Sequence, residues 1–148
     1  IGFEPSKNEA EVSRKKGIKT INKFFNFKNT KKLKKLKKNV QIICAANAIC
    51  HVPNLVSLIK GIDFLLSKRG LFIFEEPYLG SMFAKASYDQ IYDEHIFMFS
   101  LSSIKKIFNL YYYWEQNIFT LRYDCYLIKG GTYETLWSKY IKYFSKIF

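Results

Sequence analysis

The chain has 148 residues, of which 49% are apolar and 18% aromatic, so it can bury a core and is not intrinsically disordered. Its net charge of +12 comes from 21 Lys and only three Arg, and the scarcity of Arg argues against a nucleic-acid partner. The three Cys have no CxxC spacing, which predicts neither a disulfide framework nor a metal site. No apolar run is long enough for a transmembrane helix, so we expect a cytoplasmic protein without a membrane partner.

The N-terminal segment predicts a strand, a turn and a helix. Residues 1–4 read as the tail of a strand, because Pro5 favours extended geometry in the residue before it. Ser6 and Glu9 have the spacing of a capping box for a helix over residues 8–16. Since a domain rarely opens with half a strand, we expect the chain to be an internal fragment of a longer protein.

A basic stretch follows. Residues 18–25 are β-branched and aromatic and predict a short strand, after which residues 26–39 are rich in Lys. Its centre, residues 31–38, holds six lysines around Leu33 and Leu36, which would give a helix a narrow apolar stripe. The stretch is either a solvated surface segment or a patch for an acidic partner or a membrane surface.

The next segments alternate between strand and helix patterns. Residues 39–46 form a short apolar run that predicts a strand buried on both faces. Pro53 suits the first turn of a helix, residues 55–66 carry apolar side chains at helical spacing, and residues 68–70 end it with cations and Gly. Residues 71–75 predict another buried strand. This order predicts an α/β fold with a parallel, helix-covered sheet.

Polar residues occupy the ends of three of these strands. Glu4, Asn47 and Glu75 each follow an otherwise apolar strand. Parallel sheets bind ligands in the crevice beyond the carboxyl ends of their strands, so these residues predict a Rossmann-like nucleoside site. Glu4 would be the acid that accepts hydrogen bonds from ribose hydroxyls. The alternative is that each is an exposed loop residue.

The second half of the chain holds the candidate catalytic residues. Tyr92, Asp93, Glu94 and His95 stand together. A His beside carboxylates has the properties of a general base, and a nearby phenol can donate to a developing oxyanion. Their spacing alone also fits polar residues in a loop. The other histidine, His51, we interpret as structural.

The end of the chain predicts three further features. Ser100, with Ser103 three residues later, is typical of the start of an amphipathic helix over residues 101–110. Residues 111–121 predict another strand, and Gly130-Gly131 a turn. Residues 133–148 carry no informative pattern.

Several phrases occur in one specific order: residues 1–8 (IGFEPSKN), 16–21 (KGIKTI), 24–25 (FF), 46–53 (ANAICHVP), 74–79 (FEEPYL), 88–95 (YDQIYDEH) and 99–100 (FS). In this order they resemble the nucleotide-sugar C-methyltransferase family, S-adenosylmethionine-dependent enzymes that methylate a keto-sugar carbon in deoxysugar biosynthesis. The resemblance spans about residues 1–120. Its most telling part is the Tyr-x-Glu-His box.

The resemblance implies an incomplete Rossmann-like class I methyltransferase sheet with helices on both faces. Residues 1–80 would be a partial S-adenosylmethionine-binding segment that lacks the first strand and the glycine loop. Residues 81–148 would hold the catalytic motif and the remaining strands, with a truncated or divergent C-terminal part. Glu4 and Asn47 fall on cofactor-binding positions. Glu75 and Tyr78 fall on the rim of the substrate pocket.

The resemblance also assigns the catalytic roles. His95 falls on the general base, with Tyr92 and Glu94 as its companions, and no metal is assigned. His95 would remove the proton next to the carbonyl of a nucleotide-sugar substrate, and the carbanion would attack the sulfonium methyl group. Two alternatives remain open: a methyltransferase of another small acceptor, and a non-catalytic basic binding module that uses residues 31–38.

Overall fold

The computed structural model describes residues 1–86, 88, 91, 93–111, 127–129 and 132–134. The chain divides into two compact units. The first consists of residues 1–40 and 54–68, and the second of residues 41–53 and 69–148. No helix among the described residues is long and apolar enough to cross a membrane.

The first unit begins with a small parallel β-α-β arrangement. Strand β1 (Gly2–Phe3) pairs in parallel with β2 (Thr20–Ile21), and helix α1 (Lys7–Lys15) connects them. The helix has Ser6 at its N-cap, but the Ser6 side chain makes no capping bond. The predicted capping box is therefore wrong, because the Ser6 N–H instead donates to Glu4 Oε1 at 2.8 Å. The predicted strand over residues 18–25 is also shorter than expected.

The basic stretch is broken into short pieces. Helix α2 (Phe27–Thr30) and the 3-10 turn η1 (Lys34–Leu36) replace a continuous helix. Asn26 caps α2 by accepting a hydrogen bond from the Asn29 N–H at 2.9 Å. Thr30, at the end of α2, is fully buried. The lysines that follow therefore lie at the surface of a tightly anchored turn.

Helix α3 (Leu55–Leu65) packs against α2 in the first unit. Asn54 caps α3 by accepting from the Ser57 N–H at 2.9 Å. A Cβ at Gly61 would lie 3.1 Å from both the Phe25 ring and Thr30 Oγ1. The small residue thus allows α2 and the preceding residues to approach the helix closely.

Strand β4 (Leu66–Glu75) starts immediately after α3. The prediction that the helix closes at residues 68–70 is wrong, because α3 ends at Leu65 and the chain is a strand from Leu66 onward. From Gly70 onward every second residue is buried, including Phe72 and Phe74. The residues between them, Leu71 and Ile73 among them, are half-buried.

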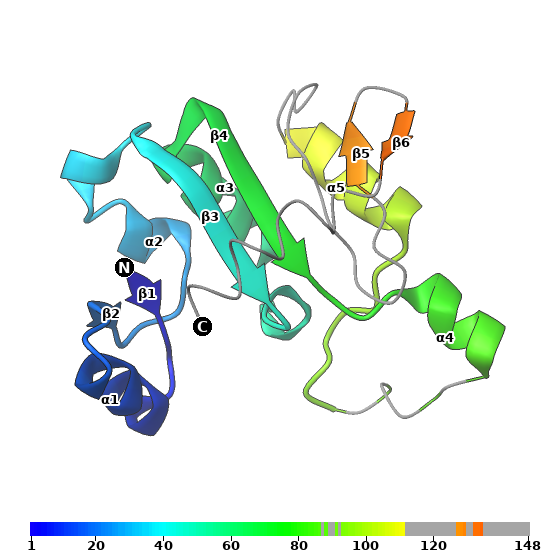
Figure 1. Ribbon diagram of the computed structural model, residues 1–148, viewed down its shortest axis with the longest axis horizontal. Coiled ribbons are helices and arrows are strands. Elements are labelled where there is room, and N and C mark those ends of the chain that lie inside the picture. The colour runs from blue at the N-terminus through cyan, green and yellow to red at the C-terminus, as the bar shows by residue number, and fades with distance from the viewer. Residues whose placement is uncertain (87, 89–90, 92, 112–126, 130–131, 135–148) are drawn as a thin grey trace. The chain divides into compact units, whose positions relative to one another are not determined.

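Strand β3 (Val40–Ala46) is hydrogen-bonded to β4, and the two arrows run in the same direction in Figure 1. The predicted burial of β3 on both faces is wrong, since Ile42 is 56% exposed and Cys44 is also exposed. In the described part of the chain this sheet contains β3 and β4 alone. One face of β3 is therefore open to solvent, and apolar side chains on that face, such as Ile42, stay exposed.

The core of the second unit is a stack of phenylalanines. Phe72 and Phe74 of β4 lie 5.2 Å apart, and Phe108 of helix α5 (Leu101–Tyr111) lies 5.9 and 6.1 Å from them. Helix α5 begins as predicted. The Ser103 N–H donates to Ser100 Oγ and the Ser100 N–H to Ser103 Oγ, at 3.1 and 3.0 Å. These reciprocal bonds form a capping box built from two serines.

The remaining elements of the second unit are short. The 3-10 turn η2 (Ile49–His51) follows β3, helix α4 (Leu79–Lys85) follows β4, and β5 (Leu127–Lys129) pairs in antiparallel fashion with β6 (Thr132–Glu134). Residue 111 belongs to α5, and the rest of the strand predicted over residues 111–121 lies outside the described residues. The Gly130-Gly131 turn also lies outside them.

Candidate functional site

A buried carboxylate organises the turn after β3. Glu76 has no exposed surface, and its Oε1 accepts hydrogen bonds from the N–H groups of Ala48 and Ile49 at 2.9 and 2.6 Å. Its Oε2 accepts a third from the Cys50 N–H at 3.2 Å. Burying a charge is costly unless it is well hydrogen-bonded, and three backbone donors meet that need. Glu76 therefore fixes the backbone of η2.

The segment before α5 is tied to the same turn. The N–H groups of Ile96 and Phe97 donate to the carbonyl oxygen of Cys50 at 2.9 and 3.3 Å. His51 Nδ1 lies 2.7 Å from the carbonyl oxygen of Glu94. A carbonyl oxygen can only accept, so Nδ1 carries the proton and, in the neutral ring, Nε2 keeps the lone pair.

These bonds bring the two histidines of the chain together. The ring centroids of His51 and His95 lie 4.9 Å apart, with the ring planes at 52°. Both residues are half-buried. The interpretation of His51 as a purely structural residue did not anticipate this placement, because nothing in its local sequence points to a residue so far along the chain. The candidate base His95 thus has a second imidazole as its neighbour.

Cys50 completes this cluster. Cys50 is only 1% exposed. Its Sγ and one ring nitrogen of each histidine all lie within 4.8 Å of one another. Burial, followed by the hydrogen bond and the negative charge of Glu76, raises the pKa of the Cys50 thiol to about 12. The thiol is therefore neutral at physiological pH.

The structure places the companions predicted for His95 as follows. Glu94 has an exposed side chain, and it contacts His51 through its backbone carbonyl oxygen. Asp93 is exposed as well. Tyr92 lies outside the described residues. The roles of the Glu94 carboxylate and of the Tyr92 phenol remain predictions.

The predicted meeting of strand ends is found for β3 and β4. The Asn47 N–H donates to the carbonyl oxygen of Glu75 at 2.8 Å. Asn47 has a φ of 46°, in the left-handed region that Asn tolerates better than most residues, and its side chain is exposed. The turn that leads from Asn47 to η2 therefore starts at the sheet tip.

Glu4 belongs to the first unit, at the end of β1. Its N–H donates to the carbonyl oxygen of Ile21 at 3.0 Å, which extends the pairing of β1 with β2. One of its carboxylate oxygens accepts from the Ser6 N–H. Its carboxylate stands at the carboxyl end of a parallel strand, as the sequence predicts.

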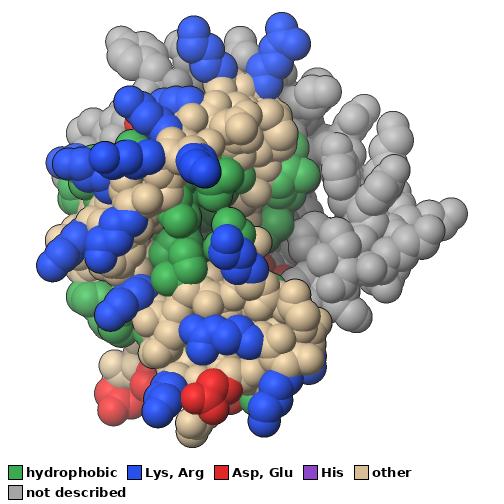
Figure 2. Space-filling view, turned by 90° about the vertical axis from the view of Figure 1, so that its left-hand side faces the viewer, with side chains coloured by type: hydrophobic (Ala, Val, Ile, Leu, Met, Phe, Trp, Pro, Cys, Tyr) green, Lys and Arg blue, Asp and Glu red, His purple; other side chains and the backbone are tan. Residues whose placement is uncertain are grey.

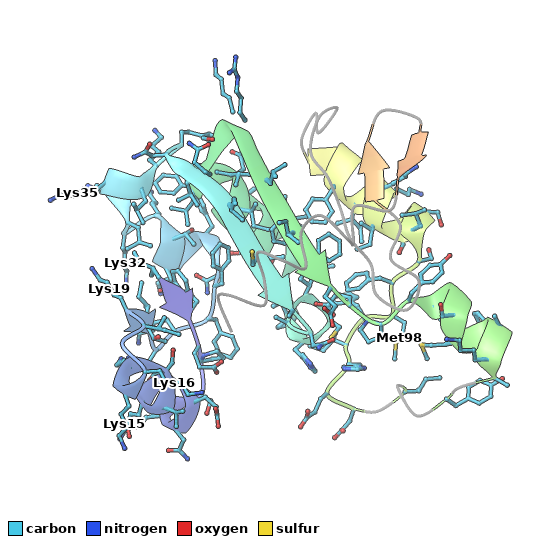
Figure 3. The ribbon with its side chains drawn as sticks, viewed as in Figure 1. Lys15, Lys16, Lys19, Lys32, Lys35 and Met98 are labelled. Atoms are coloured by element: carbon cyan, nitrogen blue, oxygen red, sulfur yellow. The ribbon has the colours of Figure 1, made fainter. Side chains whose placement is uncertain are left out.

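Tyr78 is at the N-cap of α4 and forms a parallel bridge with Phe99, while the Leu79 N–H donates to the Phe99 carbonyl oxygen at 2.9 Å. A Cβ at Gly80 would lie 2.6 Å from atoms of the Tyr78 ring. The ring therefore lies over the Gly80 backbone. Figure 3 labels Met98, which follows the His95 segment toward α5.

Three residues of this site, Glu76, Cys50 and His51, were not predicted as site residues. One signal was available for Glu76, because it continues the alternation of Phe72 and Phe74 and so points to the buried side of β4. No spacing rule connects Cys50 and His51 with His95.

The α/β fold, with a histidine pair next to the ends of its parallel strands, is typical of a Rossmann-like enzyme domain. The chain belongs to the family described as Methyltransferase domain, whose match covers residues 1–111. This match confirms the predicted partial Rossmann-like fold and places the chain in a methyltransferase family.

One curated relative narrows the comparison. The chain is 28% identical over 108 residues to "C-methyltransferase NovU" of Streptomyces niveus. The aligned region covers 73% of this chain and 26% of the relative. The chain therefore spans about a quarter of the length of the relative it matches.

Proposed function

We propose that the chain is part of an S-adenosylmethionine-dependent C-methyltransferase that acts on a nucleotide-linked keto-sugar. The observation that carries the proposal is the pairing of His95 with His51 beside the tips of β3 and β4. The similarity to a C-methyltransferase supports attack by carbon rather than by oxygen or nitrogen. The ordered phrases shared with the nucleotide-sugar family support the choice of substrate.

The candidate cofactor residues have suitable chemistry. The Glu4 carboxylate stands at the end of a parallel strand and has acceptor capacity beyond its bond to the Ser6 N–H, as recognition of ribose hydroxyls requires. Asn47 offers an exposed amide at a second strand tip. S-adenosylmethionine would supply an electrophilic methyl group on its sulfonium.

The chemistry needs a positioned base. A carbon next to a carbonyl is a weak acid, so His95 would remove its proton while a donor such as Tyr92 stabilises the enolate oxygen. Glu94 would assist the base. The Nδ1–H of His51 donates to the Glu94 carbonyl oxygen, so Nε2 of His51 is a second nitrogen, besides those of His95, that can accept a proton. Glu75 and Tyr78 would contact the substrate at the rim.

The proton-transfer step can be tested apart from methyl transfer. In deuterated buffer, a nucleoside-diphosphate keto-sugar incubated with the protein should exchange the hydrogen next to its carbonyl, measured by NMR. We expect His95→Gln to slow the exchange by about 10²- to 10⁴-fold, the usual contribution of a general base. Cys44→Ser, on the exposed face of β3, is the matched control and should exchange normally.

Full exchange by His95→Gln would show that this histidine is not the base. Methyl transfer is then measured with labelled S-adenosylmethionine, in this chain and in the same chain joined to the preceding part of its relative's sequence. Mass spectrometry of the product separates a keto-sugar from another small acceptor. Methylation of a different acceptor would overturn the proposed substrate while leaving the enzyme class intact.

A second candidate function is electrostatic binding of a phosphate-bearing polyanion by the first unit. This unit holds 15 Lys and Arg against four Asp and Glu, a net charge of +11. Figure 2 shows many basic side chains on one face with few acidic ones among them. Five of the lysines that project from this unit are labelled in Figure 3: Lys15, Lys16, Lys19, Lys32 and Lys35.

The binding module predicts salt-sensitive affinity. The chain would bind a labelled oligonucleotide or vesicles with anionic lipid at low salt and release them as salt rises. Replacing the six lysines of residues 31–38 by Gln should greatly lower the affinity, whereas Lys85→Gln in the second unit should not. If the chain binds neither probe at low salt, this candidate function is ruled out. If it binds one of them, that probe shows whether the polyanion is a nucleic acid or a lipid surface.

A further inference from the structure

We propose that Cys50, His51 and His95 form a binding site for a divalent transition-metal ion of the Zn²⁺ type. The three residues supply one thiol and two imidazoles from two separate segments, η2 and the stretch before α5. This set combines the two ligand types that Zn²⁺ prefers in proteins. Mg²⁺ and Ca²⁺ prefer oxygen ligands, so the set also discriminates against the common hard cations.

The donor atoms are already gathered. Cys50 Sγ and one ring nitrogen of each histidine lie within 4.8 Å of one another. Around a tetrahedral Zn²⁺, with bonds of about 2.0 Å to nitrogen and 2.3 Å to sulfur, such atoms stand roughly 3.5 Å apart. To bind an ion, the donor atoms would therefore have to approach one another by roughly 1 Å.

The surroundings support ligation by His51 in particular. Its Nδ1–H donates to the carbonyl oxygen of Glu94, which leaves Nε2 as the nitrogen with a lone pair. Histidines that bind metals commonly donate their other N–H to a carbonyl or carboxylate, because this bond fixes the ring and its tautomer. The hydrogen bond between His51 and Glu94 would therefore orient the His51 ring for binding a metal ion through Nε2.

The backbone holds the third ligand in reach. Ile96, the residue after His95, donates its N–H to the carbonyl oxygen of Cys50, and Glu76 anchors the Cys50 N–H from the other side. Cys50 would bind as a thiolate, so its proton leaves to solvent when the sulfur–metal bond forms. Three protein ligands leave a fourth position for water. The half-buried histidines provide the route of entry.

Metal binding has a consequence for catalysis that rests on the proposed function. A nitrogen lone pair on His95 that binds Zn²⁺ cannot also accept a proton from the substrate. A bound ion would therefore inhibit the deprotonation step reversibly. Inhibition and metal binding are separate measurements, so the failure of one does not decide the other.

Binding is tested by titrating the 148-residue chain with Co²⁺, a coloured substitute for Zn²⁺, followed by displacement with Zn²⁺. We expect a thiolate-to-Co²⁺ absorption band that Zn²⁺ removes. Cys50→Ser should lose the band, and His51→Gln and His95→Gln should each weaken metal affinity by at least tenfold, on the order of 100-fold. The Cys44→Ser/Cys125→Ser double variant is the matched control and should keep the band.

Circular dichroism and thermal unfolding check that each variant is folded. If a variant does not fold, the double variant decides, since Cys50 is then the single remaining thiol. Absence of the band in the double variant, or undiminished affinity in folded His51→Gln and His95→Gln, would overturn the site. If Zn²⁺ binds as expected but leaves substrate deuterium exchange unchanged, the metal site stands and His95 is not the catalytic base.

Discussion

The two units differ sharply in how they use charge. The first has 15 basic and four acidic residues, whereas the second has nine basic and eight acidic ones, a net charge of +1. In the first unit an ion pair between Lys38 and Asp63, at 2.6 Å, joins side chains that are substantially exposed. In the second, the buried Glu76 accepts three backbone hydrogen bonds and positions the candidate site. The candidate catalytic residues thus lie in the nearly neutral unit, where a single buried carboxylate fixes the backbone of the site.

The strongest test of this contrast is Glu76→Gln. In either orientation the amide turns its NH2 group toward at least one backbone N–H that needs an acceptor, so we expect the free energy of unfolding to fall by about 3 kcal/mol. Glu75→Gln, next to it in sequence but half-buried, is the matched control and should cost less than about 1 kcal/mol. Urea unfolding measures both. Equal losses would show that the buried carboxylate has no special role.

The next largest effect is expected in the first unit, from Gly61→Leu. Even a Cβ at this position would press on Phe25, Thr30 and the backbone of Asn26, so a larger side chain should cost about 2 kcal/mol through overpacking. Lys60→Leu, one position earlier on the exposed side of α3, should change stability little. Thermal unfolding compares the two. A neutral Gly61→Leu would mean that α2 and α3 do not pack closely.

A pH effect distinguishes Cys50 from ordinary thiols. Its pKa is raised from 9.0 to about 12 in the folded chain, so the neutral thiol is favoured by folding. This contribution is complete below pH 9 and is lost between pH 9 and about 12, because only the unfolded chain releases the proton there. The stability advantage of the parent chain over Cys50→Ser should therefore shrink as pH rises through this range. Urea unfolding at several pH values measures it, and a constant difference would contradict the raised pKa.

The smallest effect is expected from the surface ion pair. Lys38→Ala removes the contact with Asp63, and both side chains are substantially exposed. Exposed pairs contribute about 0–1 kcal/mol, so the free energy of unfolding should fall by less than about 0.5 kcal/mol, and less still in high salt. A loss comparable with that of Glu76→Gln would erase the contrast between the two units.

Local patterns predicted several elements correctly. The apolar run of residues 39–46 became β3, and Ser100 with Ser103 capped α5, because such signals act between neighbouring residues. The meeting of Asn47 with Glu75 followed from the rule that parallel strands end at one edge. The capping box at Ser6 failed because Glu4, two residues earlier, competes for its N–H.

The amino-acid sequence by itself determined the alternation of strands and helices and the family, since these depend on periodicity and on short motifs in a fixed order. It also predicted His95 as the base, and that role stays a prediction. Only the tertiary structure decided that one face of β3 is exposed to solvent, that Glu76 is buried, and that Cys50 and His51 lie beside His95. The reason is physical: burial and side-chain proximity depend on which distant segments pack together. The hydrogen bond from the Ile96 N–H to the Cys50 carbonyl oxygen and the bonds that the Glu76 carboxylate accepts from η2 make those contacts.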